Sequence, residues 1–258
     1  MSKTLAIAVK SHNRKSVIQK YHLKESHPFL DQTNDPLETE VPFKSYLPHI
    51  VYNSCLKKLE VFGDFVWPYA KRSKNITYPT KNHYFLDGDL KIWEEVKNST
   101  YDSRSYSAGK FIDNLGTVIV GGILDYKTLS SVIVITKCGE SNYDENHILP
   151  KLNQARRQHS VTVYETKMIV AGGLMGMSHE IDQSSRSKGF LLNSIEVLDL
   201  KHLEKWEFLD PLKTKIRGGS FIESPIGFLW FGWSGSESSS KSLEIVDKTN
   251  IRVGLRFV

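Results

Sequence analysis

Cysteine is scarce in this 258-residue chain, which contains only Cys55 and Cys138. A disulfide framework or a zinc site needs several thiols at characteristic spacings, so we expect neither, and both cysteines are predicted to be small apolar fillers. The 9 histidines are scattered, without the i, i+4 pairing of a metal-binding helix. The sequence therefore predicts no metal site and no cofactor.

Long apolar runs are absent as well. The N-terminal run Leu5–Val9 is shorter than the core of a signal peptide, and no segment approaches the length of a membrane span. These absences favour a cytoplasmic protein with no membrane partner. The sequons Asn75-Ile76-Thr77 and Asn98-Ser99-Thr100 would matter in a secreted protein, which is the alternative if a leader is missing from this chain.

Charge of one sign is not concentrated in any block. The chain has 34 Lys and Arg against 29 Asp and Glu, which gives a formal net charge of +5. This mild excess favours acidic partners through the long-range field of the protein. No basic cluster is dense enough to predict nucleic-acid binding.

The sequence does contain an internal repeat, and a repeat has to be recognised before any single motif is interpreted. Runs of β-branched or aromatic residues end at glycine in "KKLEVFGDFV" (57–66), "LGTVIVGGIL" (115–124), "TKMIVAGGLM" (166–175) and "GFLWFGWSGS" (227–236). Strand-like segments precede and follow each run, so we predict units of four antiparallel strands joined by polar turns. The structural residues of the repeat are Gly63, Gly121, Gly122, Gly172, Gly173, Gly232, Trp93 and Trp206. We expect the two tryptophans to be buried between neighbouring units.

One copy, "TKMIVAGGLMGM" (166–177), is similar to the start of a dinucleotide-binding loop. Such a loop places a pyrophosphate on the N-terminus of a following helix. Here Ala171 replaces the first glycine, and the residues after Met177 have no helical period. Recurrence of the pair at Gly121-Gly122 favours a structural position where bulky side chains do not fit.

These features resemble a kelch repeat, in particular the glycine pairs, the Arg156-x-x-His159 spacing and Trp206 after "NSIEVLDL". Segments that follow the glycines begin near 16, 82, 130, 194 and 242, around the period of about 50 residues typical of kelch units. The resemblance implies an all-β, kelch-type β-propeller with four complete four-stranded blades plus one partial N-terminal blade, in a small or incomplete ring. It implies a single domain over residues 1–258, with a partial blade at 1–40 and blades at approximately 41–100, 101–153, 154–212 and 213–258.

The resemblance also implies an interaction module or scaffold that binds a protein through loops on one propeller face. Arginines at the starts of inner strands and residues of the long 174–192 insertion are the candidate ligand contacts: Arg104, Arg156, Arg157, Arg217, Met175, Met177 and Arg186. Guanidinium forks bind carboxylates, and methionine is an adaptable contact, so an acidic segment of a protein is the expected ligand. The alternative is that these arginines satisfy carbonyls between blades.

Enzymatic motifs are missing, and we expect no catalytic residue. "GWSGS" at 232–236 departs at its last position from the G-x-S-x-G of a nucleophile elbow. Three alternatives remain open. They are a glycoside hydrolase that takes its carboxylates from different blades, a copper enzyme resembling galactose oxidase, for which Cys55 lies near Tyr52 but without a histidine pair, and a non-functional fragment of a longer propeller.

Overall fold

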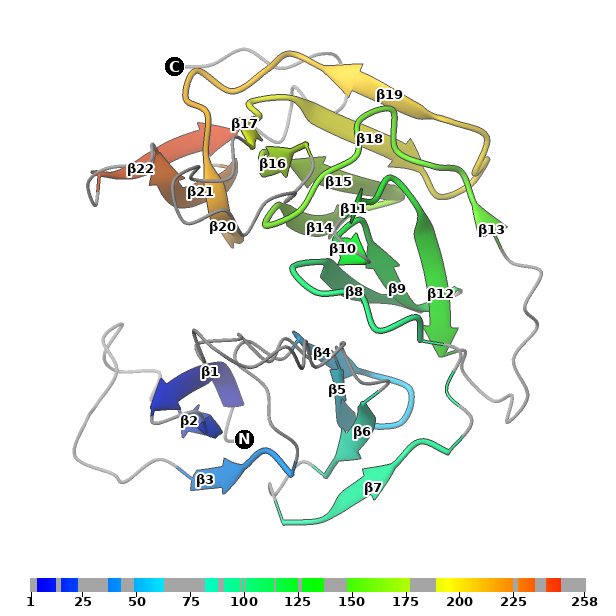
Figure 1. Ribbon diagram of the computed structural model, residues 1–258, viewed down its shortest axis with the longest axis vertical. Coiled ribbons are helices and arrows are strands. Elements are labelled where there is room, and N and C mark those ends of the chain that lie inside the picture. Colours follow the sequence, from blue (N-terminus) through cyan, green and yellow to red (C-terminus); the bar gives the residue numbers. More distant parts are fainter. Residues whose placement is uncertain are drawn as a thin grey trace, which may run out of the picture. The chain divides into compact units, whose positions relative to one another are not determined.

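The computed structural model describes residues 4–12, 15–22, 37–42, 49–62, 82–87, 91–97, 99, 101–113, 115–124, 127–136, 148–176, 189–224, 227–234 and 240–246. Within these ranges the regular structure is entirely β (Figure 1). The chain divides into two compact units, residues 1–105 and 106–258.

The first unit contains two antiparallel sheets. One has the order β1 (Thr4–His12), β2 (Lys15–His22), β3 (Leu37–Glu40), and the other has the order β4 (His49–Asn53), β5 (Lys58–Phe62), β6 (His83–Leu86), β7 (Trp93–Glu95). Neighbours in sequence are neighbours in each sheet, as is common for antiparallel sheets. Val41, Leu59, Val61 and Leu86 form the buried core of the second sheet.

The second unit contains three larger sheets and two short hairpins. The first sheet has the order β13 (Ile148–Leu149), β12 (Val132–Thr136), β9 (Gly116–Val120), β8 (Ala108–Ile112). The second has the order β14 (Ser160–Tyr164), β15 (Lys167–Ala171), β18 (Ile195–Asp199), β19 (Trp206–Leu209). The third has the order β20 (Arg217–Ser224), β21 (Gly227–Ser234), β22 (Ser240–Val246). The hairpins pair β10 (Ile123–Leu124) with β11 (Lys127–Thr128), and β16 (Leu174–Met175) with β17 (Phe190–Leu191).

Each predicted repeat range contains one antiparallel sheet of three or four described strands, and two of the ranges also contain a short hairpin. Three of these sheets have four strands, and the sheet within 1–40 is partial, with three. In the predicted blade at 213–258 the described residues supply three strands, and 247–258 lie outside the described part.

Strand β15 shows why the sequence reads as a continuous apolar run. Met168 and Val170 pack into one buried cluster, whereas Ile169 and Ala171 pack into another. Because successive strand residues point to opposite faces, a strand covered on both faces needs apolar side chains at every position. The alternation expected of a half-exposed strand is consequently absent.

Trp206 and Trp93 begin the last strands of their sheets but have different environments. Trp206 is 3% exposed and donates its indole N–H to the Pro150 carbonyl at 2.8 Å. Trp93 is only half-buried, packs edge-on against Tyr84, and donates to Thr39 Oγ1 at 3.1 Å. The expected burial thus applies to Trp206 and only in part to Trp93.

Cys55 differs from its expected role. It lies in the turn between β4 and β5, where its side chain is exposed, and it is disulfide-bonded. The prediction of a small apolar filler is wrong for this residue, because a turn between paired strands projects its side chains toward solvent. Cys138 lies outside the described residues.

The glycine pairs join one sheet to the start of the next. Gly122 donates its N–H to the Arg156 carbonyl, and Gly173 donates its N–H to the Ile216 carbonyl, each at 2.8 Å. A Cβ on Gly121 would lie 2.4 Å from the Arg156 carbonyl oxygen, so no side chain fits there. After Gly173 the chain continues into strand β16 rather than into a helix, so the helix that a pyrophosphate loop needs is absent at this position.

Candidate functional site

A backbone ladder connects the three larger sheets of the second unit. Gln158 donates its N–H to the Tyr106 carbonyl at 2.8 Å, and Gly218 donates its N–H to the Gln158 carbonyl at 2.7 Å. All three residues have positive φ, at 54°, 52° and 61° for Tyr106, Gln158 and Gly218. Tyr106 and Gln158 stand just before the first strands of their sheets, and Gly218 is the second residue of β20. The ladder therefore fixes the backbone positions of the preceding residues, Arg157 and Arg217.

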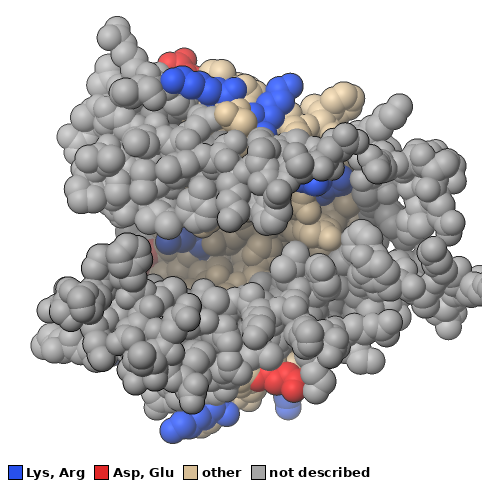
Figure 2. Space-filling view, turned by 90° about the vertical axis from the view of Figure 1, so that its left-hand side faces the viewer, with Lys and Arg blue, Asp and Glu red and all other residues tan. Residues whose placement is uncertain are grey.

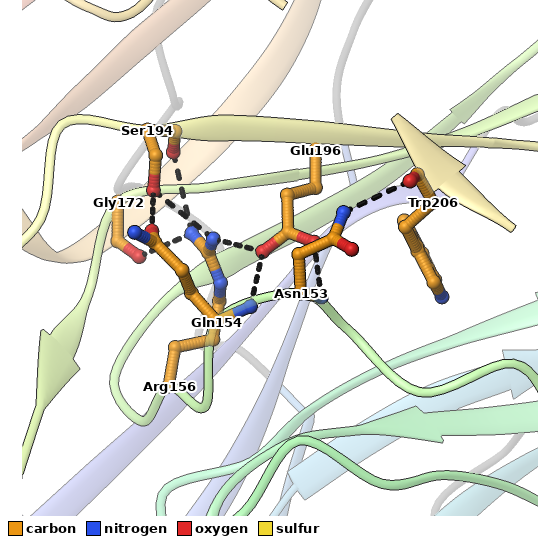
Figure 3. Close-up of polar contacts among 7 residues, drawn as sticks. All are labelled: Asn153, Gln154, Arg156, Gly172, Ser194, Glu196 and Trp206. Atoms are coloured by element: carbon orange, nitrogen blue, oxygen red, sulfur yellow. Dashed lines mark hydrogen bonds and ion pairs between the residues drawn. The ribbon is translucent and has the colours of Figure 1, made fainter. Parts of the chain in front are cut away.

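Arg156 precedes the ladder residue Gln158 in the sequence and is fully buried. Figure 3 shows its polar contacts. Its Nη1 donates to the carbonyls of Gly172 at 2.9 Å and Ser194 at 3.2 Å. Its Nη2 donates to Glu196 Oε1 at 2.5 Å and to Ser194 Oγ at 3.1 Å. Burial lowers the pKa of Arg156, and the charge of Glu196 opposes that shift. The charge of the Arg156 guanidinium is thus balanced by the Glu196 carboxylate.

Glu196 anchors the segment that precedes Arg156 (Figure 3). Its carboxylate accepts the backbone N–H of Asn153 at 2.6 Å and that of Gln154 at 3.1 Å. The Asn153 amide in turn donates to the Trp206 carbonyl at 2.9 Å. Glu196 of strand β18 therefore fixes the segment that precedes β14. Arg156 donates hydrogen bonds to carbonyls of the same sheet.

Arg157, the next residue, has a different environment. Its backbone forms an isolated bridge with Leu174, with N–H···O distances of 3.0 and 2.8 Å. Its side chain is buried, at 6% exposure, but Nη1 reaches only neutral acceptors, Thr128 Oγ1 at 3.4 Å and the Gly176 carbonyl at 3.3 Å. Within the described ranges no carboxylate forms an ion pair with Arg157.

Arg217 occupies the equivalent position in the next repeat unit. It precedes Gly218 as Arg157 precedes Gln158, and its side chain is half-buried. Burial lowers the pKa of Arg157, Tyr106 opposes that shift, and the charge of Arg217 lowers the pKa further. The two guanidinium groups thus repel each other across the ladder. We call Arg157 and Arg217 the arginine pair.

An apolar rim lies next to the arginine pair. Met175 of β16 pairs with Phe190 of β17, and the Phe190 side chain is 68% exposed. A Cβ on Gly189 would lie 3.3 Å from Arg157 Nη2, which places this hairpin directly against the guanidinium. Thr128 Oγ1 donates to the Gly176 carbonyl and so joins the β10–β11 hairpin to the β16–β17 hairpin. A buried cation and an exposed aromatic ring therefore share one site.

The other predicted contacts either belong to the first unit or lie outside the described residues. Arg104 belongs to the first unit, is buried, and donates to both carboxylate oxygens of Asp102 at 2.7 and 2.5 Å. Met177, Arg186 and the repeat glycine Gly63 lie outside the described residues, and Gly232 lies in β21.

Sequence reasoning missed Glu196, Tyr106, Thr128 and Phe190. A signal existed for Glu196, because it is an acid within the apolar strand "IEVLD". A signal also existed for Tyr106, which follows Arg104 at the spacing by which Gln158 follows Arg156. Thr128 and Phe190 contribute through short hairpins whose pairing has no local sequence pattern.

In the view of Figure 2, Lys and Arg (blue) lie near Asp and Glu (red) among other residues. Within the described ranges no group of three or more His, Cys, Asp and Glu side chains is placed to hold a metal ion. A search of the same ranges for a helix long and apolar enough to cross a membrane finds none.

No family model and no curated protein matches this sequence. Among solved structures, YjhT, a kelch-repeat propeller protein, is similar with a TM-score of 0.64. The chain has the fold of a kelch-type β-propeller. The match to YjhT covers 93% of this chain and 80% of YjhT at 13% sequence identity, so the likeness is one of fold. In this kelch-type propeller the glycine pairs lie where one blade meets the start of the next.

Proposed function

We propose that this kelch-type propeller binds an acidic segment of a protein partner through the arginine pair. The observation that carries the proposal is the contrast between two adjacent arginines. Arg156 is matched to the Glu196 carboxylate, whereas Arg157 is 6% exposed and has only neutral acceptors in the described part of the chain. A buried charge without a counter-charge is costly, and a carboxylate supplied by a ligand removes that cost.

The second cation supports recognition of a carboxylate. Arg217 stands in the equivalent position of the next unit and repels Arg157 electrostatically. A carboxylate between two guanidinium groups relieves that repulsion and accepts hydrogen bonds from both planar forks. Because Arg217 is the more exposed of the two, it makes first contact with an approaching anion, and Arg157 holds the bound group.

The apolar rim supports a peptide rather than an isolated anion. Met175 and the 68% exposed Phe190 lie on the hairpin that borders Arg157. Aromatic and methionine side chains are common in protein-binding surfaces because they offer large, adaptable contact areas. The expected ligand is thus an Asp or Glu residue flanked by an apolar residue in an exposed segment of the partner.

The test compares binding of a fluorescein-labelled peptide rich in Glu and Leu with binding of its Gln and Leu counterpart, by fluorescence anisotropy. Arg217→Ala is expected to weaken binding of the acidic peptide about 10-fold or more, as the loss of a charged hydrogen bond does. Lys215→Ala is the matched control, because Lys215 is an exposed cation two residues away. Equal losses in the two variants, or equal affinity for both peptides, would refute the proposal.

Arg217→Lys separates geometry from charge. Lysine keeps the positive charge but has no planar fork, so this variant is expected to recover less than half of the lost binding free energy. Full recovery would show that charge alone is recognised. Thermal denaturation of each variant checks that the sheets remain intact.

A further inference from the structure

A separate cluster of side chains in the first unit has the arrangement of a nucleophile, a base and an orienting acid. His83 Nδ1 lies 2.7 Å from Ser99 Oγ, and His83 Nε2 lies 2.7 Å from Glu60 Oε1. Glu60 and His83 are fully buried or nearly so, at 0% and 1% exposure, whereas Ser99 is half-buried. We call these three residues the serine relay.

The sheet register brings the relay together. Phe62 pairs with His83 and Glu60 pairs with Phe85, so Glu60 and His83 are diagonal neighbours on one face of adjacent strands. After β7 the chain returns past β6, because Val96 donates its N–H to the His83 carbonyl at 2.9 Å. This return brings Ser99 to the second nitrogen of the imidazole.

The position of the imidazole ring is fixed on several sides. Its ring centroid lies 6.0 Å from that of Phe62 and 5.6 Å from that of Phe85. Glu60 is itself held by Asn53 Nδ2, which lies 3.5 Å from Glu60 Oε2. A nucleophile needs a base whose orientation is set in this way, with a third group to position it.

The hydrogen-bond partners assign the tautomer. An ionised Glu60 only accepts hydrogen bonds, so it takes the Nε2–H of His83 and leaves Nδ1 as the acceptor. Ser99 then directs its O–H to Nδ1, while its oxygen accepts the Tyr101 N–H at 3.2 Å. One lone pair of Ser99 Oγ remains for attack on a substrate.

We infer that Ser99 is an acyl-accepting nucleophile toward small aryl esters. Ser99 Oγ attacks the ester carbonyl carbon while its proton passes to His83 Nδ1. The bond to the leaving phenol breaks, and the phenol oxygen takes the proton from His83, which leaves an acyl group on Ser99. Water then gives a proton to His83 and its oxygen to the acyl carbon, and Ser99 Oγ recovers the proton as the acid departs. Glu60 acts as a positioning residue that stabilises the transient imidazolium.

The test treats the full chain with p-nitrophenyl acetate and locates the acetyl group by intact-protein and peptide mass spectrometry. Acetylation of Ser99 is expected, and Ser99→Ala abolishes it. His83→Gln is expected to slow acetylation about 10²- to 10⁴-fold, the usual contribution of a positioned base. Glu60→Gln is expected to slow acetylation without unfolding the unit, and Glu60→Asp, which keeps the carboxylate, is expected to restore part of the rate. Ser54→Ala, at an exposed serine of the same unit, leaves the rate unchanged.

A second variant keeps the test decisive if a substitution of His83 unfolds the unit. Ser99→Cys retains His83 and Glu60, and its thiol is expected to react with iodoacetamide at pH 6 at least about 10-fold faster than the thiol of Ser54→Cys, because a neighbouring imidazolium favours thiolate. Peptide mapping separates these thiols from Cys55 and Cys138. The inference is overturned if wild-type Ser99 stays unacetylated, or if the two introduced cysteines react at equal rates.

Discussion

Arg156 and Glu196 form an ion pair of 2.5 Å in which both side chains are fully excluded from solvent. The pair joins β18 to the segment that leads into β14, since Arg156 donates to carbonyls and Glu196 accepts backbone N–H groups. The position of Arg157 follows from this anchor. The structural role thus falls to Arg156, and the proposed recognition role to its neighbour Arg157.

Glu196→Gln should lower the free energy of unfolding by about 3–5 kcal/mol, because it leaves the buried Arg156 charge without its partner. Urea denaturation followed by tryptophan fluorescence measures the change. Glu207→Gln on neighbouring β19 is the control, since Glu207 is exposed and its contact with Lys205 spans 3.6 Å. A loss of less than about 1 kcal/mol for Glu196→Gln would mean that the pair contributes little beyond a surface contact.

Trp206→Ala should cost about 3–5 kcal/mol, the range for removing a large buried aromatic side chain. Phe208→Ala lies two residues along the same strand, but its side chain is 53% exposed, so its cost should stay below about 1 kcal/mol. Chemical denaturation of both variants gives the comparison. Similar costs at the two positions would contradict the assignment of Trp206 to the core between sheets.

Gly121→Ala and Gly173→Ala should each destabilise the second unit by more than about 2 kcal/mol, through backbone strain and a clash together. The two glycines have φ values of 55° and 99°. A Cβ would lie 2.4 Å from the Arg156 carbonyl oxygen in one case and 2.6 Å from the Arg157 carbonyl oxygen in the other. Gly109→Ala in β8, where φ is not positive, should be tolerated in the same thermal denaturation series.

His49 should make the first unit less stable as the pH falls from 6.5 toward 4. Burial lowers the pKa of His49 to about 4 from 6.5, and its ring stacks on Phe62 with centroids 5.8 Å apart. Between these values the unfolded chain binds a proton that the folded chain does not, so stability is fully present above 6.5 and is lost on acidification. His49→Phe keeps the stack and removes the titration. Urea denaturation at a series of pH values should show a flatter profile for this variant, and an unchanged profile would assign the loss to other groups.

The repeat was predictable because its strands are covered on both faces. The run 168–171 has no polar position, and a Cβ on Gly121 or Gly173, which follow two such runs, would lie within 2.6 Å of a neighbouring carbonyl oxygen. Strand positions and the correspondence between units follow from that pattern. The burial of Trp93 did not follow, because it depends on how closely the preceding sheet packs, and Trp93 contacts that sheet through a hydrogen bond to Thr39.

The candidate site was predictable in part. The repeat places Arg157 and Arg217 at the starts of inner strands, but it does not show which arginine of the Arg156-Arg157 pair meets a carboxylate. That choice depends on Glu196, 40 residues later in the sequence, and on the register of β15 with β18. The serine relay was missed for the same reason, since its three members come from segments separated by 23 and 16 residues.

The backbone ladder makes the amide protons of Gln158 and Gly218 reporters of separation between sheets. Each N–H donates to a carbonyl of the preceding repeat unit. Exchange with solvent therefore requires two sheets to separate rather than the end of one strand to open. The ligand proposed for the arginine pair would contact Arg157 and Arg217, which directly precede the two donors of the ladder. Its binding would therefore slow hydrogen–deuterium exchange at both rungs together, even though neither amide contacts it.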